Sequence, residues 1–307
     1  MFSQLKQKRF TIVQLSERPL RRGLSAMQFN RRYFLGSLPL LASTAVVPNT
    51  QSRFFDFVLV HGTWHGGWVW RSVAEKLQKL GHRVWTPTCT GCGERIHLTG
   101  PQVGLDTHIE DISNVIKFED LSEIILVGHS FAGVTITGVA DQLGERVKRI
   151  VFFDAIVPRP GRLAGVPKDP FSGRFPNWWY ERSKKFVEGY QMVMWDDYPI
   201  EMLVPPDEAS AVALLRNRIT THPAKQWTDE LELKNGGWDG LSPVFIHCVG
   251  QNYRRTSEEM IGPARTGRQW QFIEADCPRD GMLTHPDLIA SLFDDLAKNK
   301  RTIKKNV

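Results

Sequence analysis

"SEIILVGHSFAGVTITGVADQLG", residues 122–144, joins a continuous apolar run to a segment with helical spacing that ends at Gly144. A short, wholly apolar run is typical of a strand buried on both faces. Between the two segments stands Ser130, with the small residues Gly128 and Ala132 on either side. A sharp strand-to-helix turn of this kind raises a serine hydroxyl above the strand ends, at the helix N-terminus. We therefore predict that Ser130 is a nucleophile, against the alternative of a purely structural serine.

The same two patterns alternate along most of the chain. Buried-strand runs and helical periodicity follow one another with short connections, which predicts an α/β fold with a mostly parallel sheet and helices on both faces. The expected strands cover 54–60, 82–88, 122–128, 147–155, 242–250 and 268–276, and the expected helices cover 69–81, 107–119, 131–144 and 286–300.

Residues 159–240 interrupt this alternation. They are rich in Trp, Pro and charged residues and contain several helix-like segments. A long insertion over an α/β sheet is typical of a lid, so we expect a helical cap over the site. The aromatic run Trp178, Trp179 and Tyr180 is interpreted as the core of this cap, with substrate contact as the alternative.

The N-terminal segment accounts for the basic character of the chain. Residues 1–32 hold eight Lys or Arg and one Glu, whereas the whole chain holds 39 basic and 33 acidic residues. The body is thus nearly neutral, which argues against nucleic-acid binding, and no apolar run is long enough to span a membrane.

Arg31-Arg32, a modestly apolar stretch and the small residues Ser43 and Ala45 form a signal layout of the twin-arginine type. Residues 1–45 are therefore predicted to be a signal region and the mature chain to start near Val46, in the periplasm or outside the cell. The alternative is an unstructured N-terminal extension.

An oxyanion hole requires two backbone N–H groups directed at one point. Phe131, directly after the serine, supplies one, and Thr63, in the loop "LVHGTWHGGW" after the first strand, is expected to supply the other. His61, His65 and His129 are interpreted as structural histidines around these two turns.

Cys89 and Cys92 form a single C-x-x-C in what reads as an irregular loop. Neither a second cysteine pair nor a histidine pair at metal-ligand spacing accompanies it. We interpret the two cysteines as small buried residues, with a disulfide or a metal or redox role as alternatives, and we predict no metal and no cofactor.

Several further motifs carry a resemblance to a known family: "FVLVHGTWHGGWVW", "GHRVWTPTCTGCGERIHL", "GLDTHIEDI", "LVGHSFAG", "FFDAIVP", "RITTHPAKQWTDELEL" and "DGMLTHPDLIASL". Together they span residues 55–297. The chain resembles the α/β-hydrolase superfamily, and within it the branch of plant methyl esterases, hydroxynitrile lyases and bacterial pyrethroid-hydrolase-like carboxylesterases. The resemblance implies an α/β-hydrolase domain over 46–307 with a cap insertion at about 159–240.

The resemblance also identifies a departure from the family pattern. Counting back from Pro286, the family's catalytic histidine falls on Arg279, and Gln251 and Asn252 stand where many relatives place an aspartate. Asp154, at the end of the preceding strand, is then the candidate acid, with a loop-capping role as the alternative.

An arginine stays protonated at any ordinary pH and cannot serve as a general base. Three explanations remain open: His97 or His285 replaces the base, the protein binds a ligand without turnover, or Arg279 reflects a local change in an ordinary esterase sequence.

The implied function is an esterase-type hydrolase for a small, apolar or aromatic ester, with Ser130, Asp154 and Arg279 at the catalytic positions. The alternatives are a ligand-binding protein of the same fold and a cofactor-free lyase. The partner is in each case a small-molecule substrate or ligand. The family topology also makes Cys248 and Cys277 neighbours, so a disulfide between them is a further hypothesis.

Overall fold

A computed structural model describes residues 54–159, 163–196, 198–250 and 258–299 of the chain. The chain divides into two units, Met1–Thr50 and Gln51–Val307, and only the second contains described residues. The proposed signal region, the start at Val46 and the Gln251-Asn252 pair lie outside the described residues.

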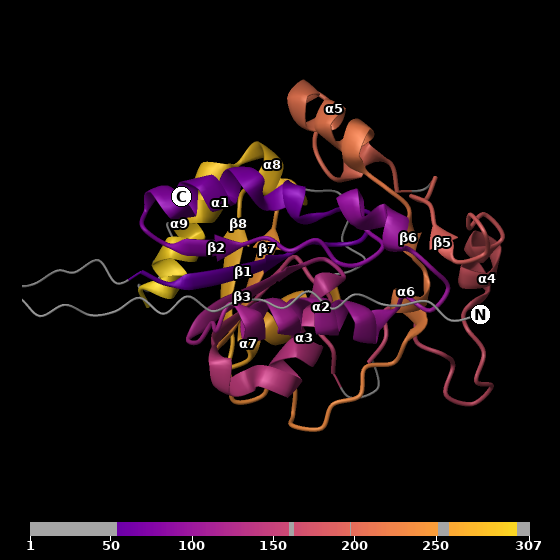
Figure 1. Ribbon diagram of the computed structural model, residues 1–307, viewed down its shortest axis with the longest axis horizontal. Coiled ribbons are helices and arrows are strands. Elements are labelled where there is room, and N and C mark those ends of the chain that lie inside the picture. Colours follow the sequence, from indigo (N-terminus) through magenta and orange to yellow (C-terminus); the bar gives the residue numbers. More distant parts are fainter. Residues whose placement is uncertain (1–53, 160–162, 197, 251–257, 300–307) are drawn as a thin grey trace, which may run out of the picture. The chain divides into compact units, whose positions relative to one another are not determined.

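The centre of the fold is a six-stranded sheet in the order β2-β1-β3-β4-β7-β8, in which every neighbouring pair is parallel. All six expected strands are present, so the predicted parallel α/β architecture is confirmed (Figure 1). The strands are β1 (Asp56–Val60), β2 (Arg83–Trp85), β3 (Ile124–His129), β4 (Val147–Phe153), β7 (Pro243–Cys248) and β8 (Gln271–Ala275).

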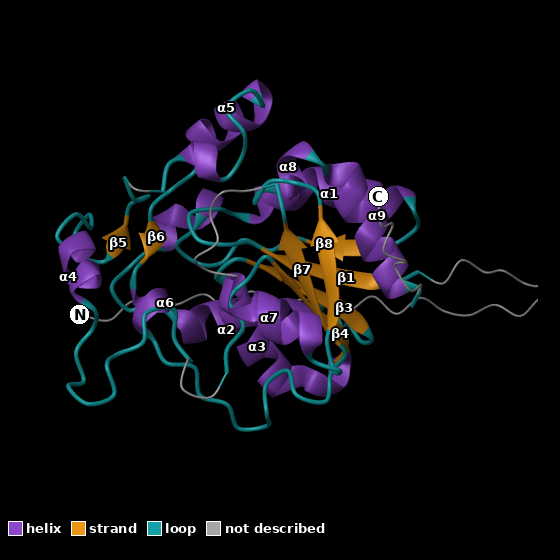
Figure 2. Cartoon of the chain, turned by 180° about the vertical axis from the view of Figure 1, so that it is seen from behind, coloured by secondary structure: helices purple, strands orange, loops and turns teal. Residues whose placement is uncertain are grey.

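Helices cover both faces of this sheet, as Figures 1 and 2 show. One face carries α1 (Arg71–Lys79), α8 (Gly281–Thr284) and α9 (Pro286–Ala297), and the other carries α2 (Leu105–Phe118), α3 (Ala132–Leu143) and α7 (Glu258–Thr266). Short 3₁₀ turns, η1 (Gly67–Trp70), η2 (Gly93–Leu98) and η3 (Gly144–Arg146), join these elements.

The apolar run of β3 shows why the sheet is central. Ile124 and Leu126 belong to the core on the α2–α3 side, whereas Ile125 and Val127 belong to the core on the α1–α9 side. All four side chains are fully buried. Because successive strand residues point to opposite faces, a strand covered on both sides needs an unbroken apolar sequence.

The insertion between β4 and β7 is less helical than expected. It contains α4 (Asn177–Ser183), the 3₁₀ turn η4 (Ile200–Met202), α5 (Ala209–Arg218) and α6 (Lys225–Thr228), together with a two-stranded antiparallel sheet of β5 (Gln191–Met192) and β6 (His222–Pro223). Long loops connect these pieces (Figure 2), in keeping with the many prolines of the segment.

The aromatic run at the start of this cap is only partly cap core. Trp179 is buried and packs on Phe186, with ring centroids 5.4 Å apart. Trp178 and Tyr180 are 43% and 39% exposed, so the prediction that they form the core is wrong for both. On a short helix, neighbouring residues point in different directions, and only one of the three faces inward.

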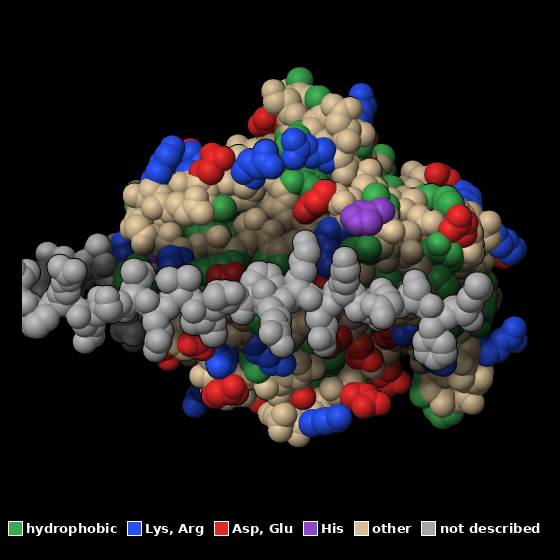
Figure 3. Space-filling model, viewed as in Figure 1, with side chains coloured by type: hydrophobic (Ala, Val, Ile, Leu, Met, Phe, Trp, Pro, Cys, Tyr) green, Lys and Arg blue, Asp and Glu red, His purple; other side chains and the backbone are tan. Residues whose placement is uncertain are grey.

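No helix in the described part of the chain is long and apolar enough to cross a membrane. On the face seen in Figure 3, acidic and basic side chains are intermingled. Mixed charges of this kind are typical of a solvated surface.

Candidate active site

Ser130 follows β3 directly, at the carboxyl edge of the sheet, in the left-handed conformation with φ 57°. Its N–H donates to the Phe153 carbonyl (3.3 Å), and its carbonyl accepts from the Ile156 N–H (2.9 Å). A Cβ at Gly133 would lie 2.0 Å from the Ile156 oxygen, so this turn admits no side chain there. These contacts hold a conformation that costs a non-glycine residue roughly 1–3 kcal/mol. The predicted strand–turn–helix elbow is therefore present.

Arg279 reaches Ser130 from the loop after β8. Its Nη2 donates to the Ser130 Oγ at 2.6 Å. Its Nη1 donates to the Asp154 carboxylate and, at 3.3 Å, to the Asp154 carbonyl. Arg279 is 1% exposed and Asp154 is fully buried, at the end of β4. The three residues at the predicted catalytic positions thus form one hydrogen-bonded chain, Ser130–Arg279–Asp154.

The chemistry of this chain follows from the guanidinium group. Arginine has five N–H donors and no acceptor, so the Ser130 Oγ accepts a hydrogen bond and has no proton acceptor in Arg279. The Arg279–Asp154 ion pair meets the requirement that a buried charge be paired. His247, on β7, adds a contact between its Nδ1 and the Asp154 Oδ1 at 3.3 Å.

The two histidines proposed as substitute bases lie elsewhere. His97 is exposed on η2, and His285 is half-buried with its Nδ1 2.7 Å from the Thr284 hydroxyl. Neither lines the cavity at Ser130 nor bonds to the serine. In this structure neither is placed to take the Ser130 proton.

His65 forms a buried pair that the sequence did not reveal. Its Nε2 lies 2.8 Å from the Asp280 carboxylate, and its Nδ1 lies 2.7 Å from the Thr63 carbonyl. Burial acts to lower the pKa of His65, but the Asp280 carboxylate outweighs it and raises that pKa. His129 is buried below the elbow, and burial, reinforced by Arg279, holds its pKa well below the usual range.

The loop after β1 approaches the elbow closely: a Cβ at Gly62 would lie 2.9 Å from the Ser130 Cβ. His61 fixes this loop, because its Nδ1 donates to the Gly62 carbonyl (2.9 Å) and its Nε2 accepts the Cys89 N–H (3.1 Å). Burial lowers the pKa of His61 to about 3, so the ring is neutral. Within the described residues, neither the Thr63 nor the Phe131 N–H donates to a protein acceptor. Their oxyanion role stays a prediction.

Aromatic side chains close the space above Ser130. Trp64 follows Thr63, whereas Trp195, Tyr198 and Trp227 come from the cap. Trp64 and Trp227 each lie against Trp195, with ring centroids 5.3 and 5.4 Å apart. The remaining cavity has a volume of about 20 Å³, which holds about one water molecule. The three cap residues were not identified from the sequence.

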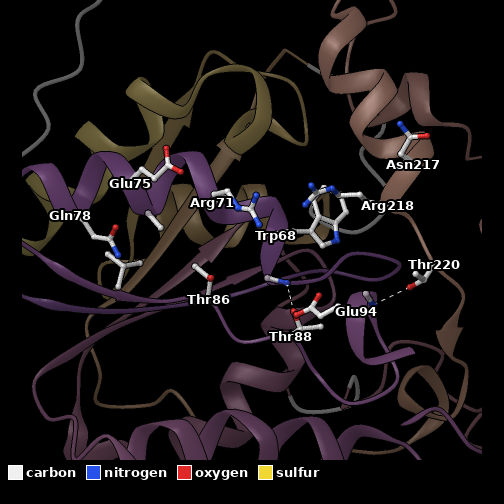
Figure 4. A pocket seen from close by; sticks show the side chains of 14 residues that line it. Trp68, Arg71, Glu75, Gln78, Thr86, Thr88, Glu94, Asn217, Arg218 and Thr220 are labelled. Carbon is white, nitrogen blue, oxygen red and sulfur yellow. Dashed lines mark hydrogen bonds between the residues drawn. The ribbon is translucent and has the colours of Figure 1, made fainter. Parts of the chain in front are cut away.

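A larger cavity of about 730 Å³ lies apart from this chemistry (Figure 4). It is lined by residues of η1, α1 and the end of α5, and Arg218 lies over the Trp68 ring, 5.9 Å from its centroid. Its lining includes no serine, cysteine or histidine. The Ser130–Arg279–Asp154 chain lies outside it, so the candidate active site is the smaller cavity at Ser130.

All four cysteines are buried free thiols. Cys248 and Cys277 are neighbours, as expected, but their sulfurs stand 3.7 Å apart and form no disulfide. Cys89 and Cys92 are likewise unlinked, in keeping with the interpretation as small buried residues.

Comparison with known proteins agrees with this architecture. A model of the alpha/beta hydrolase family matches residues 57–292. The carbendazim hydrolyzing esterase of Nocardioides sp. (strain SG-4G) is 34% identical over 241 residues, which cover 76% of this chain and 96% of that protein. The alpha-hydroxynitrile lyase of Arabidopsis thaliana is 32% identical over 109 residues, 35% of this chain and 42% of that protein.

Among solved structures, an extracellular alpha/beta-hydrolase from a Paenibacillus species superposes with a TM-score of 0.63 at 25% identity, covering 78% of this chain and 97% of that one. The family match spans well over half of the sequence, and the sheet order, the elbow and the site at the strand ends accord with it. The chain therefore belongs to the alpha/beta hydrolase family, among relatives of the esterase type.

Proposed function

We propose that this protein is a serine esterase-type hydrolase whose general base has been replaced by Arg279, and that it is consequently a slow catalyst. The observation that carries this proposal is the Ser130–Arg279–Asp154 chain, with a distance of 2.6 Å between the Arg279 Nη2 and the Ser130 Oγ. Ser130 lies at the position of the nucleophile. Arg279, which stays positively charged, occupies the position of the group that should accept the serine proton.

The assignment of roles follows the usual course of ester hydrolysis. The Ser130 oxygen attacks the ester carbonyl, and the N–H groups of Thr63 and Phe131 hold the negative charge that develops on the carbonyl oxygen. The serine proton must then pass to water, because Arg279 has no acceptor. The bond to the ester oxygen breaks, the alcohol leaves with a proton from water, and a second water molecule hydrolyses the acyl-serine. A triad without its base typically retains about 10³–10⁴-fold catalysis over water.

The proposed substrate is a small ester with an apolar or aromatic group. The Trp64, Trp195, Tyr198 and Trp227 side chains around the site support this choice. Because the cavity holds about one water molecule, substrate entry requires these side chains to move apart. The likeness to an esterase that hydrolyses carbendazim makes carbendazim a second substrate to test.

A second candidate function is ligand binding without turnover. The guanidinium of Arg279 lines the cavity next to the Ser130 hydroxyl, and this favours a ligand with a carboxylate or another anionic group. The partial likeness to a hydroxynitrile lyase supports a lyase as a further alternative.

The test measures hydrolysis of p-nitrophenyl acetate and labelling by a fluorophosphonate, with Ser130→Ala as the matched control. We expect slow hydrolysis and slow labelling, both lost in the variant. The absence of any Ser130-dependent reaction would favour the binding protein. Fast, Ser130-dependent turnover would show that a base other than Arg279 serves the wild type.

We further propose that the signal region exports the protein through Arg31-Arg32. Replacing both with lysine keeps the charge and should stop export, which a fractionation of periplasm and cytoplasm would measure. Arg21-Arg22 is a matched control pair in the same leader, and its replacement by lysine should leave export unchanged. Equal export by both double variants would contradict the proposal.

A further inference from the structure

Three side chains that bind metals well meet inside the protein, away from the catalytic serine. Cys92 precedes η2, His108 lies in α2 and His222 lies in β6 of the cap. The Cys92 sulfur and one ring nitrogen of each histidine all lie within 4.8 Å of one another. All three side chains are buried.

The outer nitrogen of each histidine is already engaged. The His222 Nε2 bonds to the side-chain oxygen of Gln226, and the His108 Nε2 lies 2.9 Å from the Thr90 carbonyl. A carbonyl oxygen only accepts hydrogen bonds, so each Nε2 carries the proton and each Nδ1 presents a lone pair. Metal-binding histidines are oriented in this way by their outer partners.

Among the described residues, only one of the two Nδ1 atoms has hydrogen-bond partners. The His222 Nδ1 lies 3.3 Å from the Cys92 sulfur and 3.4 Å from the Trp64 N–H, whereas the buried His108 Nδ1 has no hydrogen-bond partner. Buried polar atoms without partners are uncommon and call for an explanation, such as an ion.

We propose that Cys92, His108 and His222 form a Zn²⁺ site, with the thiolate and the two Nδ1 atoms as ligands. Zinc prefers sulfur and imidazole ligands, and its bond lengths of about 2.3 Å to sulfur and 2.0–2.1 Å to nitrogen place tetrahedral ligands roughly 3.3–3.6 Å apart. The distance of 3.3 Å between the Cys92 sulfur and the His222 Nδ1 matches this spacing. Binding releases the thiol proton and leaves one position for water.

The surroundings of the cluster include one carboxylate, Asp111, which also pairs with the Arg95 guanidinium at 3.6 Å. Asp111 accepts hydrogen bonds from the Thr90 N–H (2.6 Å) and the Thr90 hydroxyl (2.9 Å), and Thr90 in turn holds His108. The Asp111 carboxylate therefore supports the His108 ligand through Thr90. The ligands come from the loop after β2, from α2 and from the cap, so the ion cross-links three distant segments.

The site is tested on the full chain, independently of any substrate. Because the ligands are buried, the protein is refolded from denaturant with a chelator or with Zn²⁺, dialysed, and analysed for metal content and for Tm. We expect one zinc ion per chain and a rise in Tm of about 5 °C or more with zinc. Cys89→Ala removes a buried cysteine outside the cluster and should keep the zinc, whereas Cys92→Ala and His222→Gln should lose it.

Cobalt gives a second, spectroscopic readout of the site. Co²⁺-loaded wild type should show the near-ultraviolet absorption of a cobalt–thiolate bond, and Cys89→Ala should show the same. Wild type that retains no more zinc than Cys92→Ala, or that shows no cobalt–thiolate band, would overturn the proposal. Loss of zinc from Cys89→Ala to the same extent would also overturn it. None of these readouts depends on the chemistry proposed at Ser130.

Discussion

Replacing Arg279 with histidine should increase the esterase activity of this protein. The Nη groups of Arg279 contact both the Ser130 hydroxyl and the Asp154 carboxylate. An imidazole there has the same two partners: Asp154 to hold it and Ser130 to give up its proton. One positioned general base contributes 10²–10⁴-fold, which corresponds to roughly 2.7–5.4 kcal/mol at 1.36 kcal/mol per tenfold. Histidine is shorter than arginine, so the loop that carries residue 279 must move closer to Ser130. We therefore expect kcat to rise by at least about tenfold rather than by the full range.

The Arg279→Gln variant distinguishes the effect of adding a base from the effect of removing the positive charge. Like histidine, glutamine at position 279 removes the buried cation and can donate a hydrogen bond to Asp154. Unlike histidine, it accepts no proton at neutral pH. Only the histidine variant should gain activity. Its rate should rise with pH through the pKa of the imidazole, about 6.5 when unperturbed, because a base acts in its neutral form.

The assay is the steady-state kcat for p-nitrophenyl acetate, with circular dichroism to verify that each variant is folded. Adding Ser130→Ala to Arg279→His should abolish the gain. Two results would refute the reasoning. An equal gain in Arg279→Gln would show that removal of the charge is sufficient, and a folded Arg279→His variant without any gain would show that the elbow or the acid no longer supports catalysis.

Three further predictions concern stability, each measured as the free energy of unfolding in urea. A Cβ at Gly133 would lie 2.0 Å from a backbone oxygen, so Gly133→Ala should destabilise by about 1–3 kcal/mol, whereas Gly144→Ala, with open space around it, should change stability by about 0.5 kcal/mol or less. Asp154→Asn breaks a buried ion pair and should cost about 3–5 kcal/mol; a loss below about 1 kcal/mol would contradict that. Because the pKa of His65 is raised in the folded protein, its ion pair with Asp280 stabilises the folded state fully below the unperturbed pKa of about 6.5. This stabilisation is lost as the pH rises through the raised pKa. The stability difference between wild type and Asp280→Asn should therefore shrink with rising pH, and a constant difference would refute this.

The parts of the fold that were predictable from the sequence are those set by local patterns. The uninterrupted apolar run of β3 and the helical spacing of α3 are each visible in a short window, and Ser130 stands between them. Asp154 and Arg279 follow other strands, and the carboxyl ends of parallel strands meet at one edge of a sheet. Their meeting with Ser130 therefore follows from the topology.

The parts that were not predictable depend on contacts between residues far apart in the chain. His65 and Asp280 are 215 positions apart, and Cys92 and His222 are 130 apart. Sequence spacing does not reveal such pairs, because the spacing patterns of metal sites connect ligands that are close in the chain. The cap residues over Ser130 were missed for a related reason. Its short helices and loops give no periodicity that shows which aromatic side chains point inward.

The elbow and the base are separable properties of this protein. The positive φ of Ser130 is imposed by the Phe153 carbonyl, the Ile156 N–H and the small residue at Gly133. All of these are constraints of the backbone around the turn, and none involves Arg279. A strained turn persists when the surrounding structure fixes it, whether or not the serine reacts. The intact elbow is thus no proof of turnover, because it is compatible with both a slow esterase and a binding protein. Because Arg279 and Asp154 neutralise each other in the core, an arginine at this position is compatible with the fold, and under our proposal it removes the proton acceptor.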